Sequence, residues 1–208
     1  MSMYKNNHTK KPSDIPTPLP VCDYLYEILK GYDPKVILDP CAGDKRLTKD
    51  FKNATIINYE IKDGTDFFKV CSKINCSLVI MNPPFNGTRP LFPEKFLDHV
   101  LNLVGFDTPI LMFAPFGFRL NNHKKSERYK KLSSIYPKIT TIITLPIDIF
   151  DLKTFHTEIL IFNGDKLTTP LPPHLMFQMP YHTDTHKSPK SVKKHSSSRM
   201  KISYGSTP

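Results

Sequence analysis

The chain has 208 residues, 39% hydrophobic and 11% aromatic, which is long enough for one domain with a substantial core. Its four cysteines show no CxxC spacing, which favours free thiols in a reducing compartment over a disulfide framework or a zinc site. No apolar run reaches about 18 residues. These features predict a cytoplasmic protein without a signal peptide, a transmembrane segment or a membrane partner.

The formal net charge of +10 is unevenly distributed along the chain. Residues 181–208 carry +5, residues 1–20 carry +2 and the segment 119–131 carries +5, which leaves about −2 for the rest of the chain. A polyanion that contacts the segment 119–131 explains this distribution better than solubility does, with a solvated helix face as the alternative. The predicted nucleic-acid contacts are Arg119, Lys124, Lys125, Arg128, Lys130 and Lys131.

The first half of the chain predicts strands that alternate with helices. Pro20 suits the first turn of a helix, and Gly31 is a plausible stop after a stripe of apolar residues at helical spacing. Residues 1–14 are polar and are predicted to be flexible. The expected elements are a helix over 20–30, a strand over 36–39, a helix over about 45–51, a strand over 55–60 and a short helix within 67–74.

The second half continues the alternation and then changes composition. A strand over 77–81, a helix from Pro93, a strand over 109–115 and two strands over 138–146 and 155–163 are expected, the last two as an antiparallel pair at a sheet edge. This order predicts an α/β domain over 15–165 with a mostly parallel, doubly wound sheet. Residues 166–208 are Pro-rich and then rich in Ser, Lys and His, which predicts a flexible tail.

An apolar run, Leu78 to Met81, ends abruptly in Asn82-Pro83-Pro84-Phe85. Two prolines fix the backbone and remove two donors, so the strand cannot continue, and Asn82 falls at its carboxyl end. Ligands bind at that end of the strands in open α/β sheets. The alternative is a rigid turn in which Phe85 only fills the core.

Polar residues also follow the two preceding strands. Asp39-Pro40-Cys41-Ala42-Gly43 forms a turn in which Gly43 permits close approach to a ligand. Glu60 follows the next strand, at the spacing where a carboxylate accepts hydrogen bonds from a ribose. Asp66, in the loop after it, is within reach of an adenine amino group. The combination predicts a ligand site at one edge of the sheet.

These motifs resemble the S-adenosylmethionine-dependent amino-methyltransferases, above all those that act on the exocyclic amino group of adenine in DNA. The resemblance covers residues from about 15 to 163 and rests on DPCAG, on NPPF and on Pro16-Thr17-Pro18 before the first helix. It implies a Rossmann-like class I methyltransferase fold and S-adenosylmethionine as cofactor, without a metal. The implied cofactor contacts are Thr17, Pro18, Asp39, Cys41, Ala42, Gly43, Glu60, Asp66, Phe67 and Asn82, and the implied catalytic residues are Asn82, Pro83, Pro84 and Phe85.

The sequence departs from this family in two respects. Relatives commonly have a second glycine where this chain has Lys45, which either turns outward or crowds the cofactor. No sizeable target-recognition region is visible, so the basic segment reads the target, specificity is relaxed, or a protein partner supplies it. The alternatives to a DNA adenine methyltransferase are methylation of adenine in RNA, methylation of a protein glutamine amide, and a cofactor-binding pseudoenzyme subunit.

Overall fold

The structure is a computed structural model that describes residues 15–85, 92–120, 123–150 and 156–177. The chain divides into one unit from Met1 to Gln178 and a second from Met179 to Pro208, and all described residues belong to the first. The predictions for residues 1–14 and for the end of the tail therefore lie outside the described residues.

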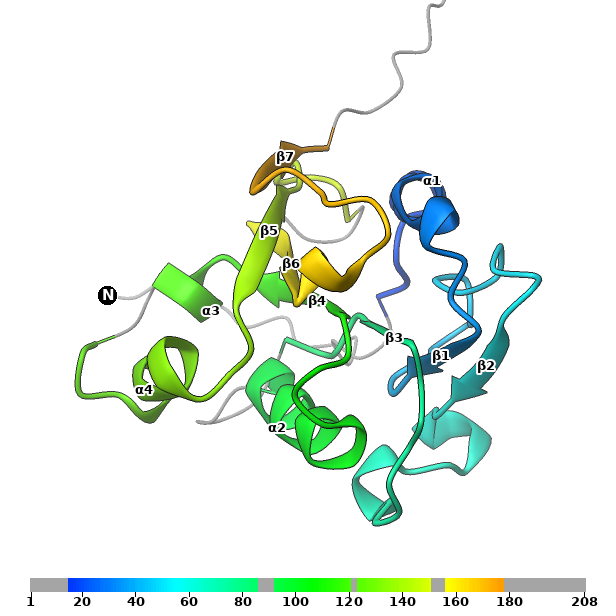
Figure 1. The fold of residues 1–208 in the computed structure, drawn as a ribbon, viewed down its shortest axis with the longest axis horizontal. Helices are drawn as coiled ribbons and strands as arrows, with labels where there is room; N and C mark the ends of the chain where they lie inside the picture. The colour runs from blue at the N-terminus through cyan, green and yellow to red at the C-terminus, as the bar shows by residue number, and fades with distance from the viewer. Residues whose placement is uncertain (1–14, 86–91, 121–122, 151–155, 178–208) are drawn as a thin grey trace, which may run out of the picture. The chain divides into compact units, whose positions relative to one another are not determined.

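Within the described residues, the strands form one seven-stranded sheet in the order β2-β1-β3-β4-β6-β5-β7 (Figure 1). Strand β6 runs antiparallel to β4 and β5, and the other neighbouring pairs are parallel. This confirms the predicted α/β fold with a mostly parallel sheet and an antiparallel pair. The strands are β1 (Val36–Asp39), β2 (Thr55–Asn58), β3 (Leu78–Met81), β4 (Ile110–Pro115), β5 (Ile139–Thr144), β6 (Thr157–Phe162) and β7 (His174–Met176).

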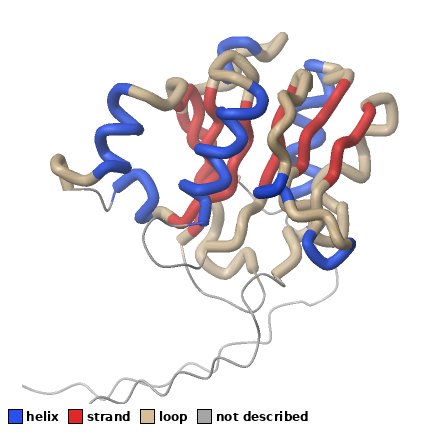
Figure 2. The backbone as a smooth tube through the Cα atoms, turned by 90° about the horizontal axis from the view of Figure 1, so that it is seen from below, coloured by secondary structure: helices blue, strands red, loops and turns tan. Residues whose placement is uncertain are grey.

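The two longest described helices lie on opposite faces of the sheet (Figures 1 and 2). They are α1 (Leu19–Leu29) and α2 (Phe92–Val104), which confirms the helices expected near 20–30 and after Pro93. The shorter helices are α3 (Gly117–Leu120) and α4 (Glu127–Ser134), and the 3₁₀ turns are η2 (Lys30–Tyr32), η3 (Ile61–Asp63), η4 (Phe67–Lys69) and η5 (Gly164–Lys166).

The central strands are buried on both faces, as a doubly covered parallel sheet requires. Alternate residues contribute to two separate hydrophobic clusters. Ile80 and Phe113 belong to the cluster that contains the apolar face of α1. Val79 and Met112 belong to the cluster that contains α2. Because successive side chains of a strand point to opposite faces, each central strand contributes to both clusters. Polar side chains that bind a ligand are therefore expected at the strand ends.

The predicted helix over about 45–51 is wrong. Leu47 and Phe51 are buried, and their spacing of four residues suggested a helix. The segment is instead a series of turns with i→i+3 hydrogen bonds, among them Lys49 N to Arg46 O and Phe51 N to Thr48 O. Short turns bury the same two side chains without closing any i→i−4 bond.

Strand β7 corrects the predicted start of the tail at residue 166. It pairs in parallel with β5 and extends the sheet by one strand beyond the antiparallel pair. Leu167 and Phe177, on either side of it, are each 5% exposed. A three-residue strand directly after Pro172-Pro173 has too few residues to show an alternating pattern, which is why composition suggested a tail.

Candidate functional site

The carboxyl ends of β1, β2 and β3 bring three predicted site residues to one edge of the sheet. β1 lies between β2 and β3 and runs parallel to both. Asp39 is the last residue of β1, Asn82 directly follows β3, and Glu60 comes two residues after β2. The parallel direction of the strands therefore assembles the residues that the sequence predicted at this edge.

Asp39 is almost completely enclosed at the start of the glycine turn. It is 1% exposed, and its Oδ1 accepts a hydrogen bond from Cys41 N at 3.2 Å. Its Oδ2 is buried and has no hydrogen-bond partner among the described residues. Burial raises the pKa of Asp39 to about 7; the Cys41 amide opposes this shift and the charge of Glu60 adds to it. Oδ2 is therefore an acceptor available to a bound group.

Glu60 connects the second strand end to the glycine turn. Its Oε2 accepts from Gly43 N at 2.8 Å and its Oε1 accepts from Lys62 N at 3.1 Å. Gly43 has φ of +53°, a conformation that glycine adopts without strain. Asp66 plays a similar local part, because its Oδ1 accepts from Phe68 N at 3.0 Å. A carboxylate oxygen has more than one acceptor site, so both side chains retain capacity for a ligand.

Lys45 takes a glycine-like conformation but turns its side chain outward. Its φ is +64°, in the left-handed region, and its backbone N donates to Ala42 O at 2.7 Å. Its Nζ lies 2.9 Å from Asp63 Oδ2, and both side chains are about half exposed. The sequence left open whether Lys45 turns outward or crowds a cofactor, and in the structure it turns outward.

Apolar side chains line the loop that carries Asp66. Phe67, the predicted adenine-ring contact, is 3% exposed and stacks on Phe96 with ring centroids 5.9 Å apart. Ile61 and Phe68, which sequence reasoning missed, are 73% and 41% exposed. Apolar residues in an otherwise polar loop are the signal that could have identified them. Ile61 and Phe68 are thus more exposed than Phe67, whose contact with an adenine ring stays a prediction.

The carboxamide of Asn82 is held by the segment before α1. Asn82 Nδ2 donates to Thr17 Oγ1 at 2.9 Å, and Thr17 is 5% exposed. Thr17 O accepts from Arg46 Nη1 at 3.2 Å. Pro83 is buried, and Phe85 is half-buried against the cluster on the α1 face. The Pro16-Thr17-Pro18 segment, the glycine-turn region and the Asn82 turn thus form one hydrogen-bonded unit.

Cys41 lies in the same unit and stays a thiol. Burial raises its pKa well above the ordinary value, the charge of Asp39 adds to the shift, and the backbone amide of Asn82 opposes it. A protonated, half-buried thiol is a weak nucleophile, so this cysteine does not suggest covalent chemistry at the site.

Four of the six cationic residues predicted to contact nucleic acid are paired within the protein. Arg119 binds Glu158, which is 1% exposed, and Lys130 pairs with Glu127. Arg128 and Lys131 contact Glu94, which is 4% exposed, and Lys131 also lies 2.6 Å from Asp98. These partners, apart from Glu127, lie more than 30 residues away in the sequence, so the sequence did not reveal them.

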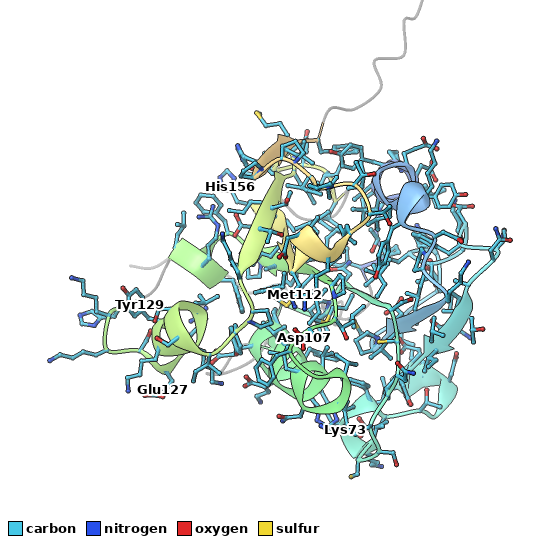
Figure 3. The ribbon with its side chains drawn as sticks, in the orientation of Figure 1. Lys73, Asp107, Met112, Glu127, Tyr129 and His156 are labelled. Carbon is cyan, nitrogen blue, oxygen red and sulfur yellow. The ribbon has the colours of Figure 1, made fainter. Side chains whose placement is uncertain are left out.

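Lys124 and Lys125 are exposed, as is Lys130, which pairs with Glu127. Neither Lys124 nor Lys125 has an ion pair within the part of the chain that the structure describes. They precede α4, whose Glu127 and Tyr129 point outward (Figure 3). Fewer unpaired cations are therefore available to a polyanion than the sequence indicated.

Phe116 is a further exposed aromatic residue at the same edge of the sheet. It follows β4, is 42% exposed, and its ring centroid lies 5.8 Å from that of His156, which directly precedes β6. The Arg119 guanidinium lies 5.8 Å from the Phe116 ring centroid and is anchored by Glu158. An aromatic residue directly after a buried strand is the sequence signal for this position.

Other features of the described residues do not compete with this edge. An open depression beside α1 is lined by Asp23, Lys49 and Asp50, but these charges pair with one another. The described residues contain no group of three or more His, Cys, Asp or Glu arranged to hold a metal ion. No described helix combines the length and the apolar character needed to cross a bilayer.

Solved methyltransferases share this fold at low sequence identity. A protein from Listeria monocytogenes described as a class I S-adenosylmethionine-dependent methyltransferase matches with a TM-score of 0.60 and 13% identity, over 81% of this chain and 67% of that chain. The methyltransferase subunit of a type I restriction-modification system from Streptococcus thermophilus matches with a TM-score of 0.56 and 18% identity, over 72% and 44%. A modification subunit of a type I restriction enzyme from Vibrio vulnificus matches with a TM-score of 0.53 and 15% identity, over 81% of this chain and 48% of that chain.

The comparison establishes a Rossmann-like α/β fold of the kind found in class I methyltransferases. The chain spans less than half of each of the two restriction-system subunits. No protein-family profile and no curated protein sequence matches this chain. The roles of the individual site residues therefore remain predictions that rest on geometry and chemistry.

Proposed function

We propose that this protein transfers a methyl group from S-adenosylmethionine to the exocyclic amino group of adenine in DNA. The observation that carries the proposal is the placement of the Asp39–Gly43 turn and of Asn82 at the carboxyl ends of adjacent strands, β1 and β3. One strand end carries features suited to a cofactor, and its neighbour carries a rigid acceptor for an amine.

The cofactor occupies the β1 and β2 side of the site in this proposal. Its α-ammonium group lies near the unpartnered Oδ2 of Asp39, because a buried carboxyl oxygen favours a cationic partner. Glu60 would accept hydrogen bonds from the ribose hydroxyls, and Asp66 together with the exposed Ile61 side chain would border the adenine ring. Lys45 leaves the turn open, since its side chain pairs with Asp63.

The substrate amine lies at Asn82. An aromatic amine is a poor nucleophile because its lone pair is delocalised into the ring. Asn82 Oδ1 and a carbonyl of the Pro83-Pro84 turn accept hydrogen bonds from the two N–H groups of this amine. These bonds direct the nitrogen lone pair toward the sulfonium methyl group. When bound, S-adenosylmethionine would supply an electrophilic methyl group, which an amine held by Asn82 and the Pro83-Pro84 turn could accept in line as the S–C bond breaks, with release of one proton. Phe85 stacks on the base, which must leave the duplex to reach the site.

DNA is the proposed substrate class because the NPPF motif resembles that of enzymes acting on adenine in DNA and because Lys124 and Lys125 offer unpaired positive charge. The described residues include no sizeable region for reading a target sequence. A partner protein that supplies target recognition is therefore part of the proposal. The neighbours from restriction-modification systems are themselves named as subunits, which supports a search for such a partner.

The proposal is tested with Asn82→Ala, using Asn102→Ala on α2 as a matched control. We expect Asn82→Ala to abolish methyl transfer to DNA while its affinity for S-adenosylmethionine, measured calorimetrically, changes little. Turnover above about a tenth of wild type, a barrier change under ~1.4 kcal/mol, would contradict the catalytic role.

The wild-type protein should be assayed in parallel with DNA and with RNA, using radiolabelled cofactor. Transfer to RNA alone would mean that the substrate is RNA rather than DNA. Cofactor binding without transfer to either would contradict the proposed nucleic-acid substrate and leave the protein glutamine amide and the pseudoenzyme subunit as the alternatives. Absence of cofactor binding would overturn the proposal as a whole.

A further inference from the structure

We propose that Thr17 is a positioning residue that holds the Asn82 carboxamide in place for the substrate amine. This inference rests on the proposed function and deepens it. The resemblance placed Thr17 among the cofactor contacts, but the structure engages its hydroxyl with Asn82 across 65 residues of sequence.

The geometry provides an enclosed partner for the nitrogen end of the carboxamide. Asn82 Nδ2 donates to Thr17 Oγ1 at 2.9 Å, within the range of a good hydrogen bond. Thr17 is 5% exposed, so little water competes for the hydroxyl. With the nitrogen engaged in this way, Oδ1 is the end of the side chain left to accept a hydrogen bond from a ligand.

Orientation matters because the two ends of a carboxamide have opposite hydrogen-bonding roles. The terminal torsion of asparagine is broad and roughly two-fold, so an unrestrained side chain samples both orientations. In the flipped orientation, the NH₂ group of Asn82 would face the N–H bonds of the substrate, donor against donor. The Thr17 hydroxyl accepts from Nδ2 in the observed orientation, and although a hydroxyl can also donate, this contact restrains the carboxamide torsion before the substrate binds.

Thr17 itself is rigidly mounted. It precedes Pro18 and follows Pro16, which restricts its backbone to extended conformations. Its carbonyl accepts from Arg46 Nη1 at 3.2 Å, and Arg46 Nε is in turn held 2.6 Å from Asp44 Oδ2. A branched side chain on this backbone has few rotamers, so the hydroxyl is presented in one place. Thr17 is therefore held in place by contacts within the protein, without a ligand.

Two variants separate positioning from packing and from cofactor contact. Thr17→Val keeps the shape but removes the hydroxyl, and Thr17→Ser keeps the hydroxyl but removes a methyl group. For Thr17→Val we expect turnover at saturating substrate to fall by roughly 10–100-fold, with cofactor affinity within about threefold of wild type. Thr17→Ser should recover most of the turnover. Thr141→Val, at a buried threonine on β5, controls for loss of a buried hydroxyl elsewhere.

The outcomes discriminate among three roles. Weaker cofactor binding in Thr17→Val with unchanged turnover would assign Thr17 to the cofactor and overturn the inference. Equal losses of turnover in the Val and Ser variants would indicate packing and would also overturn it.

A readout that needs no activity keeps this inference separate from the proposed function. The side-chain NH₂ signals of Asn82, observed by ¹⁵N NMR of the full chain, should shift and exchange faster with water in Thr17→Val but not in Thr17→Ser. Unchanged signals in Thr17→Val would overturn the positioning role, whether or not the wild type methylates DNA. If these signals respond as expected while the wild type transfers no methyl group, only the proposed function fails.

Discussion

Asp39 shows how a single enclosed carboxyl group can be suited to a ligand and costly to the free protein. It is 1% exposed, and one of its oxygens has a partner while the other has none among the described residues. An unpaired buried charge is unfavourable, so the folded protein favours the neutral acid. A cationic ligand beside Oδ2 would reverse that preference. The free protein thus bears an electrostatic cost that ligand binding removes.

The free energy of unfolding should therefore depend on pH through Asp39. Its pKa is raised from 3.8 to about 7 in the folded protein, first by burial, so between these values the folded state holds more protons than the unfolded state. Stability from this group then falls as the pH rises from about 4 to about 7. Asp39→Asn cannot ionise, so it should be more stable than wild type at pH 8, by on the order of 2–4 kcal/mol relative to their difference at pH 4.

Urea denaturation of both proteins across this pH range measures the effect. Parallel pH profiles for wild type and Asp39→Asn would mean that Asp39 ionises equally in the folded and unfolded states.

The residues at the strand ends were predictable because each follows an apolar run in the sequence. Asp39, Glu60 and Asn82 all reach the edge that the strand order implied. The hydrogen bond between Asn82 and Thr17 was not predictable, because it joins positions 65 residues apart and leaves no local pattern. The exposure of Ile61, beside the buried ring of Phe67, was likewise not predictable from the sequence.

At the scale of elements, α4 is attached to α2 by charges rather than by apolar packing alone. Lys131 reaches Glu94 and Asp98, and Tyr136 donates to Asp98 at 2.8 Å. Burial lowers the pKa of Lys131, but hydrogen bonds and charges from Asp98 and Glu94 outweigh it, so the net shift is upward. The amino group therefore stays charged, and a segment that reads as a basic surface in the sequence is largely an internal ion-pair network.

Experiments can separate the unpaired lysines, Lys124 and Lys125, from Lys131, which is part of the ion-pair network. Lys124→Ala with Lys125→Ala should weaken DNA binding at every sequence and reduce the slope of log affinity against log salt by up to about 0.9 for each phosphate that is no longer neutralised. Its free energy of unfolding should change by less than about 0.5 kcal/mol, as for ordinary surface substitutions. Lys131→Ala should instead destabilise the protein by on the order of 1–3 kcal/mol, because Glu94 loses a partner while remaining buried.

Lys130→Ala is the matched control, since its pair with Glu127 is exposed. The assignment fails if Lys131→Ala alters the salt slope while the double variant leaves it unchanged.

Elements marked by a continuous apolar run were predicted well, and elements fixed by distant contacts were not. Strands β1, β3 and β4 are continuous apolar runs, which follows from burial on both faces. The segment 45–51 has the apolar spacing of a helix, but the left-handed backbone of Lys45 and the i→i+3 turns after it prevent one. Strand β7 depends on pairing with β5, which a three-residue pattern cannot indicate.

At the scale of the whole described fold, residues after β6 complete the core. Phe177 and Leu167 belong to the same cluster as α1, and the Phe177 ring lies 5.2 Å from that of Tyr24 in an edge-on contact. The sheet and the α1 face therefore need the chain as far as residue 177.

Shortened chains test this requirement. A chain that ends at residue 178 should keep the unfolding midpoint of the full chain within about 2 °C. A chain that ends at residue 165 loses β7 and two buried apolar side chains, each worth about 1.5–3 kcal/mol on full burial, and should unfold at a markedly lower temperature or fail to fold. Thermal unfolding followed by circular dichroism measures both. Equal midpoints for the two chains would mean that residues 166–177 are dispensable for the core.

The contact between Tyr24 and Phe177 has a consequence for synthesis on the ribosome. Helix α1 leaves the exit tunnel first, and its apolar face is completed by side chains about 150 residues later. At roughly 5–20 residues per second, this face stays uncovered in the nascent chain for on the order of ten seconds. During that interval the strands β1 to β4 can already pair, but the core on the α1 side remains open. The nascent protein is thus exposed to aggregation on one face of its sheet until residue 177 has left the tunnel.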